Sequence, residues 1–173
     1  MRRRWGLVLS GIATILLLWA MSPSDQRMKD TGGHGIVPFE LAGSQDRADE
    51  ILEEWGEDGR DAARESLWID FGFLIAYGAF LTLALLWARD FSAGRAWRRL
   101  AATGGVVVFF GAAGAACDAV EDVFLLLTLD GAGAAAPLLA TIFASAKFAF
   151  LAVAIAYLLA VLALATGRAI QRA

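Results

Sequence analysis

Three carboxylates lie inside a strongly apolar stretch of this chain, CDAVEDVFLLL, which covers residues 117–127. On a helix, Asp118 precedes Glu121 by three positions and Asp122 by four, so the three side chains share one face. An ionised side chain at the centre of a bilayer costs at least about 2.5–3.5 kcal/mol on insertion scales. This face is therefore expected to meet other protein groups, water, a proton or a cation.

Lys147 is the one charged residue of the apolar stretch 137–166 and is the natural counterpart of these acids. Counted from the connection between the two stretches, Asp118 lies roughly 18 Å deep and Lys147 roughly 15 Å deep, at about 1.5 Å of rise per residue. The connection is short, which predicts antiparallel neighbours. We therefore expect Lys147 to pair with Asp118 or Glu121.

Acids outnumber lysine at this depth. Asp70 lies near the outer end of a further apolar stretch, at a depth of about 6–8 Å by the same rise, and Tyr77 lies two turns further along the same face. One ion pair cannot neutralise four carboxylates, so water, protonation, a bound cation or an external amine is needed. The alternative is a lysine–aspartate pair that only fixes helix register. The candidate ligand or ion-coupling residues are Asp70, Asp118, Glu121, Asp122, Lys147 and Tyr77.

The elements that position these residues are predicted to be membrane spans. The chain has 173 residues, of which 58% are hydrophobic, and its mean hydropathy of +0.59 is too high for an ordinary soluble domain. A helix of about 20 residues crosses a bilayer. Four stretches are long and apolar enough to do so, near residues 5–21, 66–87, 101–129 and 137–166. We therefore predict an all-α membrane protein, in which a four-transmembrane-helix bundle forms a single membrane domain.

Arginine distribution predicts the orientation. Basic residues concentrate at the N-terminus, between the second and third spans and at the C-terminus, which places these parts in the cytoplasm. The predicted topology is N-in/C-in in a bacterial cell inner membrane, with residues 22–65 exoplasmic. The first span is interpreted as a retained anchor rather than a cleaved signal peptide. The arginines that are predicted to lie on the cytoplasmic side are Arg2, Arg3, Arg4, Arg89, Arg95, Arg98, Arg99, Arg168 and Arg172.

The exoplasmic segment divides into two parts. Residues 22–37 are polar and rich in glycine, which predicts a loop. An apolar stripe from Pro38 to Trp55 predicts an amphipathic helix that ends at Gly56, and a second short helix then continues into the second span. Phe39, Leu52 and Trp55 would anchor the amphipathic helix on the membrane surface or cap the bundle. A simple lid and a partner- or ligand-binding element are both compatible with this pattern.

Small residues mark the third span as central. Glycine and alanine on one helix face allow another helix to approach closely. The helix-packing residues are Gly104, Gly111, Gly114 and Ala115.

Known catalytic and metal motifs do not occur in the sequence. His34 is the single histidine and Cys117 the single cysteine, so the chain lacks the several histidine and cysteine ligands of a typical zinc site. The chain has no GxSxG elbow, HExxH helix or Walker-type glycine loop. We predict no metal site and no cofactor.

Three segments, GIVPFELAGSQDRADEILEEW, SLWIDFGFLIAY and CDAVEDVFLL, resemble an uncharacterised bacterial family of four-span integral membrane proteins. The resemblance implies the four-span topology and no activity.

Two classes of function compete. The favoured interpretation is an accessory or scaffold subunit of a membrane complex with a buried polar cluster, docking through the third span and the exoplasmic helix. The second is a small transporter or binding protein that uses the intramembrane acids for a cation, a proton or an amine. An enzyme acting on lipid headgroups is third, with the same carboxylates as acid–base pairs or metal ligands. Enzymatic activity is not the favoured interpretation. Expected partners are the lipid bilayer, a membrane protein or second copy, and a cation or small amine, but no nucleic acid.

Overall fold

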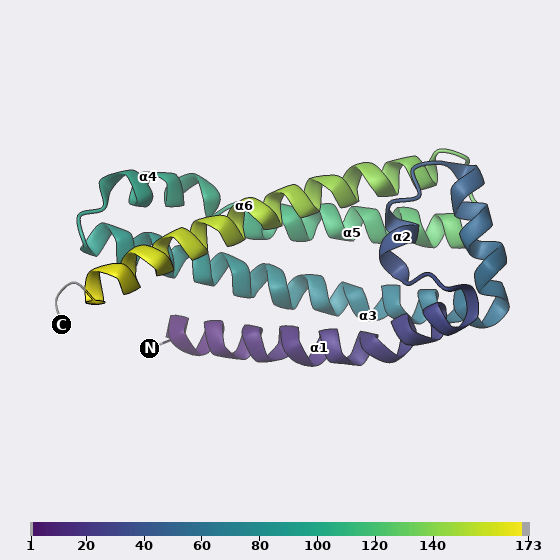
Figure 1. The fold of residues 1–173 in the computed structure, drawn as a ribbon, viewed down its shortest axis with the longest axis horizontal. Coiled ribbons are helices and arrows are strands. Elements are labelled where there is room, and N and C mark those ends of the chain that lie inside the picture. Colours follow the sequence, from purple (N-terminus) through teal and green to yellow (C-terminus); the bar gives the residue numbers. More distant parts are fainter. Residues whose placement is uncertain (1, 171–173) are drawn as a thin grey trace.

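The computed structural model describes residues 2–170, which contain helices and no strands. Arg172 lies outside the described residues. Figure 1 shows the order and arrangement of the helices. They are α1 (Arg2–Gly32), α2 (Ile36–Glu40), α3 (Gln45–Gly94), α4 (Arg98–Val107), α5 (Phe110–Leu129) and α6 (Ala136–Ile170).

Four helical segments are long and apolar enough to cross a membrane. They are 3–32, 45–94, 98–129 and 136–167, and each contains one predicted span. The third is made of α4 and α5, which are separated by a short break at residues 108–109. α1 packs along α3, and α5 packs between α3 and α6.

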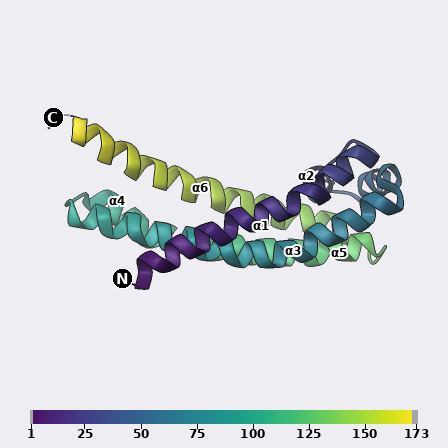
Figure 2. The ribbon, with the colours of Figure 1, turned by 90° about the horizontal axis from the view of Figure 1, so that it is seen from below.

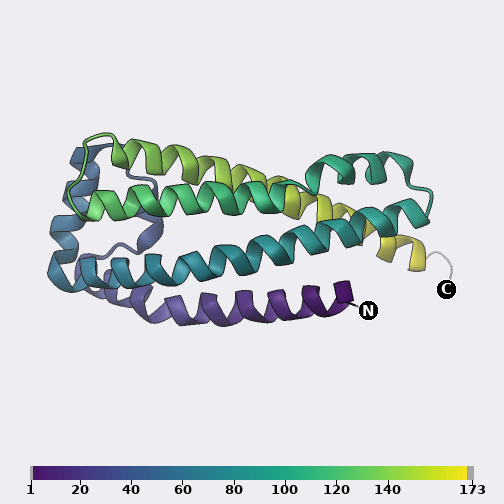
Figure 3. The same ribbon diagram turned by 180° about the vertical axis from the view of Figure 1, so that it is seen from behind.

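Both chain ends lie at the same end of the molecule. α1 begins and α6 ends there, whereas α2 and the α5–α6 connection lie at the opposite end, which we call the α2 end (Figure 3). Viewed from below, α6 diverges from α1 and α3 toward the end at which the termini lie (Figure 2). The separation between α1 and α6 matters for the site described below.

The loop predicted for residues 22–37 is wrong over most of its length, because α1 continues to Gly32. Pro23 lies inside the helix, where it removes one backbone hydrogen bond. Tertiary packing offsets this loss, because Met28 is completely buried. Within the helix, Lys29 also pairs with Asp25 one turn earlier. Gly33 then ends the helix with a left-handed backbone (φ +73°) that glycine adopts without strain.

The helix predicted from Pro38 is interrupted. α2 is a single short turn ending at Glu40, and Ser44 starts α3 by accepting a hydrogen bond from the Arg47 N–H. The predicted stop at Gly56 is confirmed, since this residue has φ +57° and breaks the helical geometry. The following helix continues without interruption into the second span.

The side chains predicted as membrane-surface anchors are buried inside the protein. Phe39 and Trp55 are each 1% exposed, and their ring centroids lie 5.1 Å apart. The Trp55 indole N–H donates to the His34 carbonyl at 2.7 Å. Leu52 packs in the same apolar cluster, together with residues of α5 and α6. These residues therefore face protein at the α2 end, which agrees with the predicted alternative that they cap the helices rather than lie on a surface.

Small residues bring α3 close to α5. A Cβ atom at Gly111 would lie 2.7 Å from the Thr82 backbone nitrogen, and one at Gly78 would lie 2.8 Å from the Ala115 Cβ. Gly104 faces the Tyr157 hydroxyl of α6 in the same way, whereas Gly114 leaves ordinary space around it. Close contact along α3 aims the acidic face of α5 at protein rather than lipid.

Candidate functional site

Five carboxylates and one ammonium group meet near the α2 end, where α2, α3, α5 and α6 converge. Each of these six residues is at most 7% exposed. Burial of so many ionisable groups in one place is costly unless they are paired. We call this set the acid cluster: Glu40, Asp70, Asp118, Glu121, Asp122 and Lys147.

Lys147 is the centre of the ion pairs. Its Nζ lies 2.7 Å from Asp118 Oδ1 and 2.8 Å from Glu121 Oε2. The pairing expected with one of these acids thus forms with both, because their spacing on α5 places them on one face. Glu40 Oε2 lies 3.5 Å from the same ammonium. One positive charge is therefore shared by three carboxylates.

Glu40 was missed in the sequence analysis. Its position depends on α2, which is held against α6 by Thr141: the Thr141 hydroxyl donates to the Glu40 carbonyl at 2.8 Å and accepts from the Gly43 N–H at 2.9 Å. The available signal was a lone acid in the otherwise apolar GIVPFELAG stretch. Burial raises the pKa of the Glu40 carboxyl above its ordinary value, and the Lys147 ammonium opposes that rise.

A second group within the acid cluster meets the lysine only through Asp118. Asp70, Asp118 and Asp122 each offer a carboxylate oxygen, and these oxygens all lie within 4.8 Å of one another. Asp70 Oδ1 and Asp122 Oδ2 are buried without a hydrogen-bond partner among the described residues. Like charges at this separation repel strongly when water is excluded. The arrangement calls for a proton or a cation between them.

Carboxylate oxygens are the ligands that hard cations prefer, and three of them could hold Mg²⁺, Ca²⁺ or Mn²⁺. No metal site was predicted from the sequence, because the spacings of histidine and cysteine residues do not reveal a site made of carboxylates on two helices. This carboxylate group assembles from α3 and α5 only in the fold.

The acid cluster borders a cavity of about 540 Å³ between α1, α3 and α6. Four of its charged residues and the Tyr77 hydroxyl form one end of the cavity, whereas apolar side chains line the rest. The Tyr77 hydroxyl is buried and has no hydrogen-bond partner among the described residues. The apolar lining comes mainly from Leu18, Phe73, Phe80, Phe148, Ile155 and Leu158.

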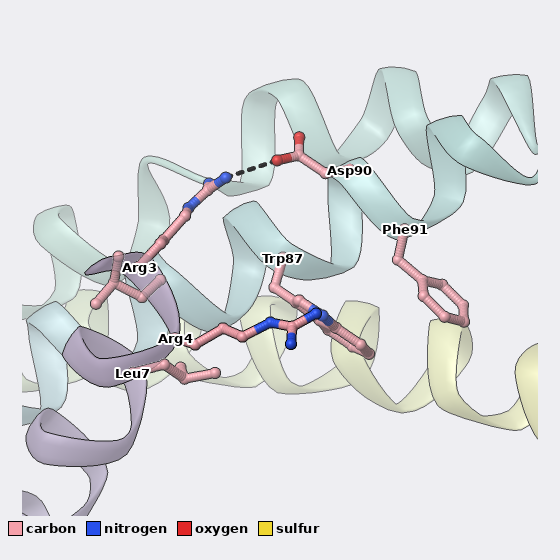
Figure 4. Close-up of a pocket in the computed structure, with 7 residues that line it drawn as sticks. Arg3, Arg4, Leu7, Trp87, Asp90 and Phe91 are labelled. Carbon is pink, nitrogen blue, oxygen red and sulfur yellow. Dashed lines mark hydrogen bonds and ion pairs between the residues drawn. The ribbon is translucent and has the colours of Figure 1, made fainter. Parts of the chain in front are cut away.

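A smaller recess of about 330 Å³ lies near the opposite end of the molecule, between the start of α1 and the end of the α3 span. Figure 4 shows Arg3 reaching Asp90 across this recess, which Arg4 and Trp87 also line. The Arg3–Asp90 ion pair measures 2.6 Å, and both side chains are nearly half exposed. An exposed pair of this kind contributes little stability. We therefore interpret the recess as a contact between α1 and α3 at the protein surface.

No protein-family model, no curated protein and no solved structure matches this chain. The resemblance to a four-span family therefore stays a prediction. The helices and the acid cluster together define an all-helical protein with four candidate membrane spans and a buried, acid-rich polar site.

Proposed function

We propose that this chain is a four-helix integral protein of a bacterial inner membrane that binds a cation in its acid cluster. In the predicted N-in/C-in topology, the α2 end is exoplasmic, and α2 with the start of α3 forms a cap over the site. The proposal takes up the second of the two classes considered from the sequence, a small transporter or binding protein.

The excess of buried carboxylates over lysine is the observation that carries the proposal. Lys147 meets Asp118, Glu121 and Glu40, but no ion pair to Asp70 or Asp122 occurs among the described residues. A purely structural pair would need one acid and one base, and the further acids would only add desolvation cost. A cation bound between Asp70 and Asp122 would give their unpartnered oxygens the charge that they lack.

Cation-dependent stability tests the proposal. A ligand that binds only the folded protein stabilises it by about 2.7 kcal/mol at a hundred times its dissociation constant. The thermal unfolding midpoint of the purified protein in neutral maltoside micelles should therefore rise with at least one member of a panel of Mg²⁺, Mn²⁺, ethylamine and dodecylamine.

Two neutral variants and one matched control identify the site. Asp70→Asn and Asp122→Asn should each abolish the rise in midpoint. Asp130→Asn, which alters an exposed carboxylate paired with Arg64 at the same end of the molecule, should leave it intact. If no cation in the panel raises the midpoint of the unmodified protein, or if all three variants respond alike, the proposed function is wrong.

An accessory or scaffold role is the second candidate, and a groove favours it. This groove, of about 600 Å³, runs between α3 and α5 and is lined largely by Gly78, Ala79, Ala112, Ala115, Ala116 and Ala119. Small residues of this kind allow a further membrane helix to approach closely. Replacing Ala112 with leucine should release a partner protein from co-purification without changing the response to cations.

A further inference from the structure

We infer that the cation is the head of a lipophilic amine, whose apolar body occupies the 540 Å³ cavity and whose ammonium group reaches Asp70 and Asp122. This inference rests on the proposed function and names its ligand class. Three features support it: the polar end of the cavity, its apolar length, and the side from which it opens.

The polar end already accommodates one primary ammonium group. Lys147 contacts two carboxylate oxygens at 2.7 and 2.8 Å, which is the spacing of charge-assisted hydrogen bonds. Asp70 Oδ1 and Asp122 Oδ2 remain unpartnered among the described residues, although both residues are more than nine-tenths buried. Asp70 lines the cavity, and a carboxylate oxygen of Asp122 lies within 4.8 Å of one of Asp70. This pair of acceptors suits a second ammonium donor that enters from the cavity.

The rest of the cavity suits a hydrocarbon body rather than a hydrated ion. Its lining extends along α3 from Asp70 to Leu81 and along α6 from Lys147 to Leu158. On each helix these end residues are eleven positions apart, which corresponds to about 16 Å at 1.5 Å of rise per residue. That length is comparable to an extended dodecyl chain. A site that served a metal ion alone would have no use for an apolar chamber of this length.

The cavity opens toward the lipid-facing surface of the helices. Leu18 of α1 and Ile155 of α6 both line it, yet they are 57% and 50% exposed. α1 and α6, which supply these two residues, separate toward the end at which the termini lie (Figure 2). An amphiphilic amine partitions into a bilayer with its chain among the lipid tails, and it would enter the cavity from the side with its head toward the α2 end.

Photoaffinity labelling tests the ligand class. A dodecylamine analogue with a diazirine near the end of its chain is incubated with the full-length protein in phosphatidylcholine nanodiscs, irradiated, and located by peptide mass spectrometry. Label is expected on the apolar cavity lining. Unlabelled dodecylamine should suppress it at least tenfold, whereas dodecanol and ethylamine at the same concentration should not.

A cavity-filling pair of variants tests the apolar body separately. Ile155→Trp places a large ring at the wall of the cavity and should abolish the labelling. Leu159→Trp, one turn further along α6, alters a residue that is 59% exposed and outside the cavity lining, and it should label like the unmodified protein. Both side chains are exposed, so folding of the two variants should be comparable.

The outcomes separate this inference from the proposed function. Suppression by dodecanol as strong as that by dodecylamine would overturn the inference, because the cavity would then accept any alkyl chain. A rise in unfolding midpoint with Mn²⁺ or ethylamine but not with dodecylamine would also overturn it and leave cation binding in place. No response to any cation would remove both.

Discussion

Replacing Lys147 with methionine should destabilise the protein by about 3–5 kcal/mol, the cost of breaking a buried ion pair by removing one partner. The variant leaves Asp118 and Glu121 buried, after they had each contacted the ammonium within 2.8 Å, and methionine fills a similar volume without charge. At about 2–4 °C per kcal/mol, the thermal midpoint should fall by roughly 6–20 °C. Circular dichroism of the protein in neutral micelles measures this shift.

Two further variants show whether the loss arises from the charges. Adding Asp118→Asn and Glu121→Gln to Lys147→Met removes the two carboxylates closest to the lost ammonium and should restore more than half of the lost stability. Arg64→Met breaks the Arg64–Asp130 pair, which is as short (2.7 Å) but about half exposed, and should cost less than about 1 kcal/mol. An equally small loss for Lys147→Met would refute the reasoning, as would a failure of the neutralising changes to restore stability.

Two other perturbations probe the cap and the helix packing. Glu40→Gln should become stabilising relative to the unmodified protein as the pH rises above about 4.3, the ordinary pKa of glutamate. Burial raises the pKa of Glu40 in the folded state, so ionising this carboxyl at higher pH lowers the stability of the unmodified protein but not of the variant. Parallel curves of stability against pH for the two proteins would argue against this burial. Gly111→Ala should cost about 1–3 kcal/mol by forcing a Cβ against Thr82, whereas Gly105→Ala, which meets nothing within 4 Å, should be neutral or stabilising; equal unfolding midpoints would contradict the close α3–α5 contact.

The four candidate membrane-spanning helices were predictable because hydrophobic length is a local property. Each predicted span lies inside one candidate membrane-spanning segment. The continuation of α1 past Pro23 was not predictable in the same way. Proline and glycine indicate a loop locally, but the buried Met28 and the packing of α1 on α3 decide the conformation, and that packing involves residues far apart in the sequence.

The candidate site was predictable in part for a similar reason. The similar depth of Lys147, Asp118 and Glu121 on two antiparallel helices was enough to predict that these side chains meet. Glu40 reaches the cluster only because α2 folds back onto α6, and a five-residue helix has no periodicity that would reveal its direction. The cavity could not be predicted from the sequence either, because it depends on how α1, α3 and α6 are placed relative to one another.

Phe39, Leu52 and Trp55 show a limit of amphipathic patterns. An apolar stripe indicates that a helix buries one face, and the stripe is the same for burial against lipid and burial against protein. Here the neighbouring helices supply the apolar surface, and all three side chains lie in the protein core at the α2 end.

Saturable binding of radiolabelled dodecylamine to the protein in nanodiscs tests the central claim most directly. After subtraction of the label taken up by empty nanodiscs, the unmodified protein should saturate near one amine per chain. The variant Asp70→Asn/Asp122→Asn should retain no saturable component, while Asp130→Asn should bind like the unmodified protein. Equal saturable binding by all three proteins, or none by the unmodified protein, would contradict the assignment of the acid cluster as a binding site for a lipophilic amine.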